Sequence, residues 1–184
     1  TNPIIFENLD LGWKGIYVLS KEEDNSILHN VVIRNTTGVS DGLLSLTGGV
    51  NLYKGNIKLK KLDIQGSKAE DSLNIVQAHV DIEDLNISNS YSDSFDCDYC
   101  TGIIKSSTFD NIGGDALDFS GSMLLITDVI VSNVKDKGFS IGEASDIKIN
   151  DSSISNIGVG IATKDGSNAS GSNIDIQGYS MYAA

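Results

Sequence analysis

The sequence predicts an all-β protein: one right-handed parallel β-helix, a solenoid of about seven coils of ~22 residues with three short strands per coil. Three observations lead to this fold. Helical periodicity is nearly absent. Short runs of Ile, Val, Leu and Phe alternate with polar residues, as they do in strands. Asparagines recur after these runs at a nearly fixed interval, with 22, 22 and 23 residues between the last four of them: Asn35, Asn89, Asn111, Asn133 and Asn156.

The repeat divides the 184-residue chain into one domain, 1–184. Residues 1–12 are expected to form an N-terminal cap or partial coil, residues 13–178 the coils, and residues 179–184 the start of a further coil. The first two coils are longer than the others, and residues 21–25 and 47–51 are expected to be their extra loop residues. The predicted coils are 15–35, 41–66, 71–89, 93–111, 115–133, 137–156 and 159–178.

Each coil supplies apolar residues at matching positions of its three strands. The first strand gives inward pairs, which are Leu73/Ile75, Phe95/Cys97, Leu117/Phe119, Phe139/Ile141 and Ile161/Thr163. The second gives the column Leu59, Ile82, Ile104, Ile126, Ile149 and Ile174. The third gives Ile33, Ile64, Ile87, Phe109, Val131, Ile154 and Ile176. Parallel strands stack about 4.8 Å apart, and parallel connections are almost always right-handed, which predicts stacked aliphatic columns inside a right-handed coil.

The asparagine column is expected to be structural. Each asparagine follows a third strand, where the chain must turn, and Asn tolerates left-handed backbone geometry there. Gly66 and Gly178 occupy the same position in their coils, as a left-handed turn predicts. Stacked side-chain amides can hydrogen-bond from coil to coil as a ladder.

Charge excludes some partners. The formal net charge is −12 and the sequence pI about 4.3, so nucleic acid and anionic membrane surfaces would be repelled. Cations and neutral sugars remain compatible with such a surface. No apolar run is long enough to span a bilayer.

Two cysteines, Cys97 and Cys100, stand in a single CxxC pattern. No second CxxC or histidine cluster completes a zinc site, and no βαβ context indicates a thioredoxin-like motif. One core thiol and one turn thiol are therefore expected.

Outward residues of the first strands stack one coil apart into three columns. The first column reads Asp71, Asp93, Asp115, Lys137; the second reads Asn74, Asp96, Asp118, Ser140; the third reads Val76, Asp98, Ser120, Gly142, Lys164. Two carboxylates about 5 Å apart repel by roughly 3 kcal/mol at an effective dielectric constant near 20. A cation, a lysine, water or a raised pKa must offset this repulsion, unless the side chains simply splay into solvent.

The columns support two kinds of chemistry. Hard carboxylate oxygens suit Ca²⁺, so Asp96, Asp98 and Asp118 are candidate calcium ligands, although no cofactor is required. A carboxylate pair with split pKa values suits glycoside hydrolysis. Aromatic residues for sugar stacking are few, namely Trp13, Tyr17, Tyr53 and Tyr99. The expected substrate contacts are Asp71, Asn74, Tyr99 and Lys164.

The coil pattern resembles the pectin-lyase-like superfamily, and three segments are similar to motifs of family 28 polygalacturonases. That family carries Asn-Thr-Asp, Asp-Asp and Gly-His-Gly on consecutive coils. Here Asp93 matches the aspartate of the first motif and Asp115 the second residue of the pair, within 91–96 and 113–117. Gly114 stands where the family places its general acid, and Lys137 replaces the histidine. For an enzyme, the resemblance implies Asp93 and Asp115 as the carboxylate pair and Lys137 as an electrostatic contact.

Segments 113–122 and 158–167 also resemble β-helix repeat domains of secreted or cell-surface bacterial proteins, which implies that location. The expected function is an extracellular module that binds or presents itself to polysaccharide or cations through its acidic face. The alternative is a carbohydrate-active enzyme, a glycoside hydrolase or uronan lyase, using Asp93 and Asp115. The expected partner is a polysaccharide or a neighbouring domain of a larger protein. The apolar end at 179–184 predicts an end-to-end contact.

Overall fold

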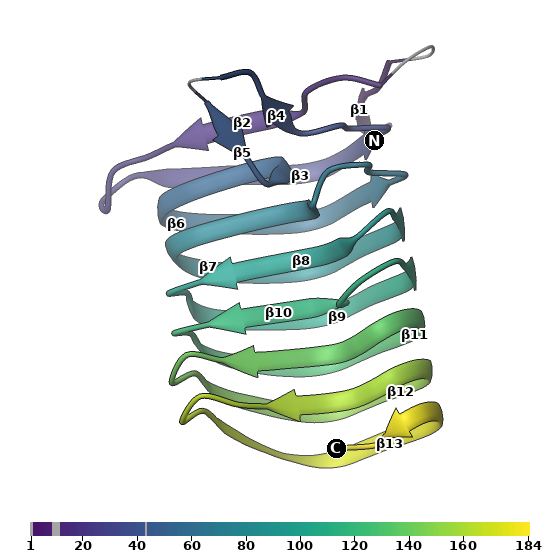
Figure 1. Ribbon diagram of the computed structural model, residues 1–184. Helices are drawn as coiled ribbons and strands as arrows, with labels where there is room; N and C mark the ends of the chain where they lie inside the picture. Colours follow the sequence, from purple (N-terminus) through teal and green to yellow (C-terminus); the bar gives the residue numbers. More distant parts are fainter. Residues whose placement is uncertain (1, 9–11, 43) are drawn as a thin grey trace.

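The computed structural model describes residues 2–8, 12–42 and 44–184, and these form parallel strands stacked into a β-solenoid of about six turns (Figure 1). This confirms the predicted fold class. The turn count is slightly lower than predicted, because β1 and β2 at the N-terminal end are short. The strands are β1 (Ile4–Phe6), β2 (Ile16–Leu19), β3 (Asn25–Arg34), β4 (Val39–Ser40), β5 (Ser45–Leu46), β6 (Gly48–Gln65), β7 (Asp71–Ser90), β8 (Asp93–Asp98), β9 (Thr101–Ile112), β10 (Leu117–Ser120), β11 (Met123–Gly142), β12 (Asp146–Thr163) and β13 (Asn168–Tyr182).

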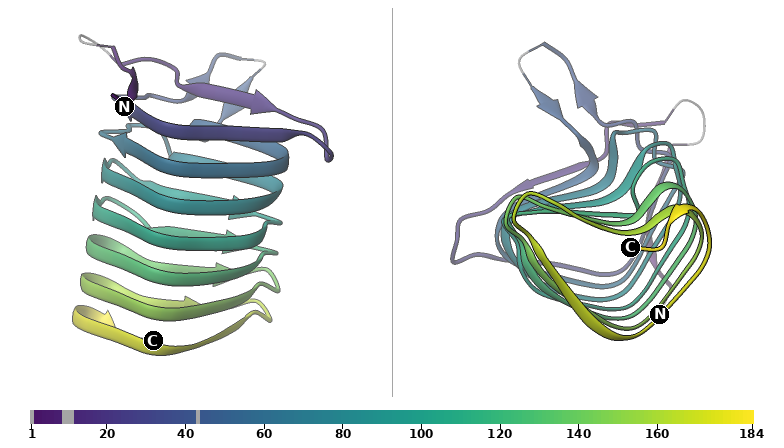
Figure 2. Two further views of the ribbon diagram at one scale, coloured as in Figure 1. Left: turned by 180° about the vertical axis from the view of Figure 1, so that it is seen from behind. Right: turned by 60° about the horizontal axis from the view of Figure 1, so that its bottom comes forward.

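Many strands are longer than the three short strands predicted per coil. β7 runs for 20 residues and bends rather than breaks. Single residues with left-handed backbone make the bends: Gln77 with φ 56°, Asp84 with φ 60° and Asn89 with φ 57°. A lone left-handed residue turns the chain without ending its pairing to the neighbouring coil. The coil therefore closes around one core, as the view from its C-terminal end shows (Figure 2).

The predicted inward columns form the core. The third-strand column is confirmed throughout, from Ile33 paired with Ile64 to Ile154 paired with Ile176. The first-strand pairs are also in register, with Phe95 paired to Leu117. The second-strand column is wrong at its last member, because Gly171 pairs with Ile149. Ile174 lies three residues further along and pairs with Ser152 instead.

The asparagine turns have the predicted backbone, with φ between 53° and 58° at all five positions. The amide ladder is confirmed in part. Asn111 Nδ2 donates to Asn89 Oδ1 over 2.7 Å, and Asn156 Nδ2 donates to Asn133 Oδ1 over 2.6 Å. Asn133 donates to Asp110 instead of Asn111, so the ladder has a break where a carboxylate competes with the amide.

The insertion in the second coil is not where the sequence indicated. Residues 48–51 of the expected loop belong to β6 and are buried. The inserted residues are the antiparallel hairpin β4–β5, which projects away from the solenoid (Figure 2). Residues 21–24 connect β2 to β3, as expected. Alternating buried residues in β6 outweigh the turn propensity of its Gly-Gly start.

Both ends of the solenoid carry short pairings. β1 pairs with β3 at the N-terminal end, while residues 1 and 9–11 of the expected cap lie outside the described residues. At the other end Tyr179 pairs with Ile157 and Tyr182 with Val159. The described residues include no helix that could cross a membrane.

Candidate functional site

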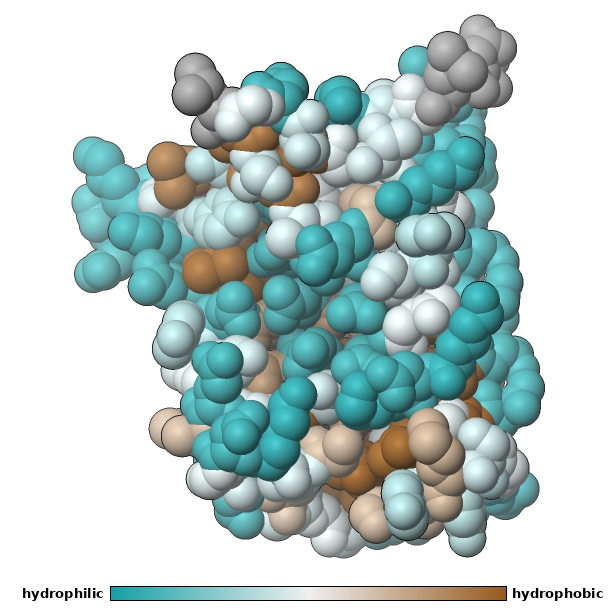
Figure 3. Space-filling model, in the orientation of Figure 1, coloured by the Kyte–Doolittle hydropathy of each residue, from teal (hydrophilic) through white to brown (hydrophobic). Residues whose placement is uncertain are grey.

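The candidate site is the outward surface of the stacked first strands, here named the first-strand face. It comprises residues 16–19, 50–53, 71–76, 93–98, 115–120, 137–142 and 159–164. Strands β8 and β10 lie at its middle, where the surface is mostly hydrophilic (Figure 3).

The structure brings the predicted columns together on this face. Asp71 pairs with Asp93, and Asp96 pairs with both Asn74 and Asp118. Asp98 pairs with Ser120 in the third column. A rung is here one coil's contribution to the face. Because the parallel strands are in register, side chains at equivalent positions of consecutive coils are one strand spacing apart. The carboxylates therefore lie on a grid with about 4.8 Å between rungs.

The first column is occupied by backbone hydrogen bonds. Asp93 Oδ1 accepts the Asp115 N–H over 2.8 Å, and Asp115 Oδ1 accepts the Lys137 N–H over 3.0 Å. Asp115 is also buried. Each carboxylate thus holds the backbone at the equivalent position of the following coil, which is a structural task for residues predicted to be catalytic.

Lys137 neutralises part of this column. Its Nζ lies 3.2 Å from both carboxylate oxygens of Asp115 and 2.7 Å from Asp136 Oδ2. Burial alone would lower the pKa of Lys137, but the hydrogen bond to Asp136 and the charge of Asp115 carry that pKa above its usual value. Burial raises the pKa of Asp93 and of Asp115, and Lys137 opposes the rise in both.

Gly114, where the resemblance places a carboxylic acid, is sterically required. A Cβ added at this position would lie 1.9 Å from Asp93 Oδ1. The hydrogen bond from the Asp115 N–H to Asp93 Oδ1 therefore needs a glycine at position 114. The sequence differs from the polygalacturonase motif at this position because Asp93 Oδ1 occupies the space that a side chain at position 114 would need.

The second and third columns are different. Among the described residues, the carboxylates of Asp96, Asp98 and Asp118 accept no hydrogen bond and make no ion pair. Burial raises the pKa of Asp96 to about 8, and the nearby carboxylates of Asp71 and Asp98 add to the rise. Burial likewise raises the pKa of Asp98. These carboxylates are half-buried without a cation beside them.

Asp71 is the most N-terminal carboxylate of the three columns and lies next to Thr47, the residue that follows β5. Asn74 Nδ2 donates to Thr47 Oγ1 and, over 3.5 Å, to Asp71 Oδ2. Burial raises the pKa of Asp71 to about 6, while its hydrogen bond with Thr47 opposes the rise. Asp71 and Asn74 are both buried, so the two predicted substrate contacts form the floor of the face rather than its surface.

Two tyrosines continue the same columns beyond the carboxylates. Tyr17 pairs with Asn51, one rung before Asn74, and Tyr53 pairs with Val76 in the third column. Their rings meet edge to face with centroids 5.6 Å apart. Burial raises the pKa of Tyr53, and the charges of Tyr17, Asp71, Asp96 and Asp98 add to it. The tyrosine pair therefore borders the acidic grid directly.

The other candidate contacts lie apart. Tyr99 is 57% exposed, and its ring lies over Gly121, where a Cβ would be 2.6 Å from Tyr99 Cδ1. Lys164 is exposed at the C-terminal end of the third column. Trp13 donates from Nε1 to the Arg34 carbonyl over 2.7 Å and stacks on Phe6, so it packs at the N-terminal end of the solenoid.

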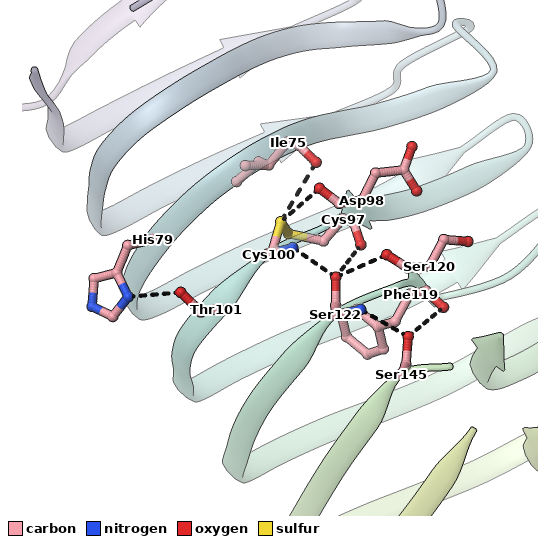
Figure 4. The surroundings of a disulfide bond; sticks show 10 residues. All are labelled: Ile75, His79, Cys97, Asp98, Cys100, Thr101, Phe119, Ser120, Ser122 and Ser145. Atoms are coloured by element: carbon pink, nitrogen blue, oxygen red, sulfur yellow. Dashed lines mark hydrogen bonds between the residues drawn. A yellow bond between two sulfur atoms is a disulfide. The ribbon is translucent and has the colours of Figure 1, made fainter. Parts of the chain in front are cut away.

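The expected pair of thiols is wrong, because Cys97 and Cys100 form a disulfide beneath the face (Figure 4). Tyr99 between them has φ 55°. This left-handed turn brings both side chains inward, where each is fully buried. Strand alternation predicted only Cys97 to point inward.

A buried serine column next to the disulfide was not predicted. The Cys100 N–H donates to Ser122 Oγ over 2.8 Å, the Ser122 N–H to Ser145 Oγ over 3.0 Å, and the Ser145 N–H to Ser167 Oγ over 3.1 Å. Ser122 Oγ donates in turn to the Cys97 carbonyl over 2.8 Å (Figure 4). The spacing of these serines, 23 and 22 residues, was the available signal.

Metal binding has no preformed site in the described residues, where no three His, Cys, Asp or Glu side chains are placed to hold an ion. Calcium binding at Asp96, Asp98 and Asp118 stays a prediction. The single arginine, Arg34, pairs with Glu7 and Gln65 away from the carboxylates.

No protein-family model matches this chain, and no curated protein or solved structure is detectably similar to it.

Proposed function

We propose that this protein is a polysaccharide-binding module that contacts its ligand with the first-strand face. The observation that carries the proposal is the position of Tyr17 and Tyr53 in the same columns as the carboxylates. Tyr17 is 46% exposed. An aromatic ring offers an apolar surface to the C–H face of a sugar, and polar groups beside it bind the hydroxyls. An extended ligand lying along the solenoid axis would meet both.

Catalysis by Asp93 and Asp115 is the second candidate, and the raised pKa of both carboxylates favours it, since a glycosidase needs one protonated acid. Binding is the better-supported function because both carboxylates are occupied by backbone amides. The hollow of about 360 Å³ beneath the hairpin β4–β5 is lined by Thr47 and Glu70, among others, and not by Asp93 or Asp115.

We also infer a relationship to the pectin-lyase-like superfamily and an extracytoplasmic location. Stacked coils with polar turn columns support the first. The Cys97–Cys100 disulfide supports the second, because such bonds persist mainly in oxidising compartments. Retention of the disulfide in protein isolated from its natural source, with free thiols blocked at lysis, tests the location. Two free thiols would contradict it.

The experiment that tests binding is affinity electrophoresis of the protein through gels containing neutral, anionic and amino polysaccharides. Tyr17→Ala should weaken binding about tenfold, equivalent to about 1.4 kcal/mol. Tyr179→Ala is the matched control, because Tyr179 is 49% exposed, close to Tyr17, but pairs with Ile157 outside the first-strand face. The same polysaccharides are assayed for release of reducing ends and unsaturated products. Turnover that Asp115→Asn abolishes would replace the binding proposal with the enzymatic one.

A further inference from the structure

The first-strand face holds an excess of hydrogen-bond acceptors without donors. Asp96, Asp98 and Asp118 occupy neighbouring positions on two rungs and have no partner among the described residues. An acceptor removed from water without a donor is costly, and more so when it is charged.

Two further groups at the ends of the second column point to a ligand. Among the described residues, only two buried side-chain polar atoms lack a hydrogen bond, Asn74 Oδ1 and Ser140 Oγ. Asn74 is 5% exposed and Ser140 0%. Asn74 pairs directly with Asp96, and Ser140 directly with Asp118, so all four side chains share one side of the sheet. Because Asn74 Nδ2 is used by Thr47 and Asp71, its free oxygen is turned away from those residues.

The two lysines of the face, Lys137 and Lys164, do not pair with the carboxylates of the second column. Lys137 is held by Asp115 and Asp136 in the first column. Lys164 stands three rungs from Asp98 in the third column; its side chain lies over Gly142 and makes no ion pair with another described residue. Among the described residues, neither lysine of the face forms an ion pair with Asp96 or Asp118.

We propose that the second column binds the ammonium groups of an amino polysaccharide, a glycan chain whose sugars carry free amines. This deepens the proposed function and rests on it. An ammonium offers three N–H donors, which match Asp96, Asp118 and the free oxygen of Asn74. Tyr53 lies two rungs before Asp96 and Tyr17 three rungs before it, and together they provide the apolar surface for a neighbouring sugar ring and a site for cation–π attraction.

Two other cationic ligands fit less well. Calcium needs six to eight oxygens at about 2.3–2.6 Å, whereas these carboxylates form an open row and no three of them are placed to hold an ion. A basic peptide would use the carboxylates but has no need of the tyrosine pair. The open row beside an exposed ring favours a linear cationic sugar chain.

The test compares two probes of equal length by calorimetry at pH 6, where Asp96 carries a proton in the free protein that a bound ammonium would displace. The probes are a fully deacetylated chitosan hexamer and the fully N-acetylated chitin hexamer. They differ in charge at each amine. The deacetylated probe should bind at least tenfold tighter. In the double variant D96N/D118N this margin should vanish while binding of the acetylated probe is unchanged. D175N is the control, since Asp175 is exposed on the third strand of the last coil and its Asn variant keeps an acceptor for Gln177.

Failure of this inference and failure of the proposed function give different results. Equal affinity for the two hexamers would overturn the amine proposal and leave polysaccharide binding intact. Absence of binding to either hexamer and to every gel polysaccharide would remove both. Hexalysine binding tighter than the chitosan hexamer, with no loss in Tyr17→Ala, would assign the column to a basic peptide. Displacement of the chitosan hexamer by stoichiometric CaCl₂ would assign it to calcium.

Discussion

Asp96 should make the protein less stable as the pH rises. Its pKa is about 8 in the folded chain, against 3.8 for the ordinary side chain. Between these values the folded state holds a proton that the unfolded state has lost, so stability falls with rising pH across this window. Below about pH 4 both states are protonated and the cost disappears. This is the reverse of the usual carboxylate, whose partners in the fold depress its pKa.

The magnitude follows from the size of the shift. About 4 pKa units at 1.36 kcal/mol each set a ceiling near 6 kcal/mol. Asp96 is half-buried and coupled to its neighbours, so about 1–3 kcal/mol is expected at pH 8. Asp96→Asn removes the charge and keeps the shape. Its melting temperature should exceed that of the parent by about 3–10 °C at pH 8, because 1 kcal/mol moves a chain of this size by about 2–4 °C.

Thermal unfolding followed by circular dichroism between pH 4 and pH 8.5 measures this effect. The gain from Asp96→Asn should be near zero at pH 4 and grow with pH. Asp175→Asn, which removes an exposed charge elsewhere, controls for the general effect of lowering the net negative charge. An equal gain in both variants, or a gain from Asp96→Asn that does not change with pH, would refute the reasoning.

Three further predictions concern the packing around the face. Gly114→Asp should cost at least 1–3 kcal/mol in urea unfolding and create no hydrolase activity, because its Cβ would overlap Asp93 Oδ1; an active, equally stable variant would contradict the account of that site. Cys100→Ser should melt above Cys97→Ser, although both lose the disulfide and both positions are fully buried, because a serine at position 100 continues the serine column through Ser122, whereas position 97 stacks between Ile75 and Phe119; equal melting temperatures would show that only the disulfide matters. Ser122→Ala should lower the free energy of unfolding by about 1–3 kcal/mol by leaving the Cys100 amide without an acceptor. Ser132→Ala, at a half-buried position, should lower the free energy of unfolding less. A larger loss in Ser132→Ala would contradict the importance given to the Ser122 hydrogen bond.

The repeat explains why the grid of side chains could be predicted from the sequence. Each coil has nearly the same length, so a residue and the one 22 positions later share a column, as with Asp71 and Asp93. Predictions from the repeat period were wrong where a coil differs in sequence from its neighbours. Gly171 stands at the position paired with Ile149, where an aliphatic residue was expected. The prediction assigned Ile174 to this column instead, but Ile174 pairs with Ser152 in another column.

The hydrogen-bond and disulfide partners of the residues on and beneath this face could not be predicted from the repeat period. Thr47 reaches Asn74 because the hairpin β4–β5 delivers it there, and a hairpin inserted into a repeat has no counterpart in other coils. The disulfide depends on a left-handed Tyr99, a residue that propensity does not place there. The hydrogen bonds that the Asp93 and Asp115 carboxylates accept from backbone amides depend on side-chain rotamers, which the repeat period does not specify.

Construction from coils of equal length has a consequence for how the face can vary in size. Every coil between β6 and β13 pairs only with the coil before and the coil after it, so deletion or duplication of one period leaves all remaining pairings unchanged. Removing residues 112–133 would join Asn111 to Val134 at equivalent turns and shorten the face by one rung, about 4.8 Å. An insertion of another length, such as the hairpin β4–β5, projects from a coil without adding a rung. The reach of this surface along an extended ligand can therefore change only in whole steps, each bringing its own set of three outward side chains.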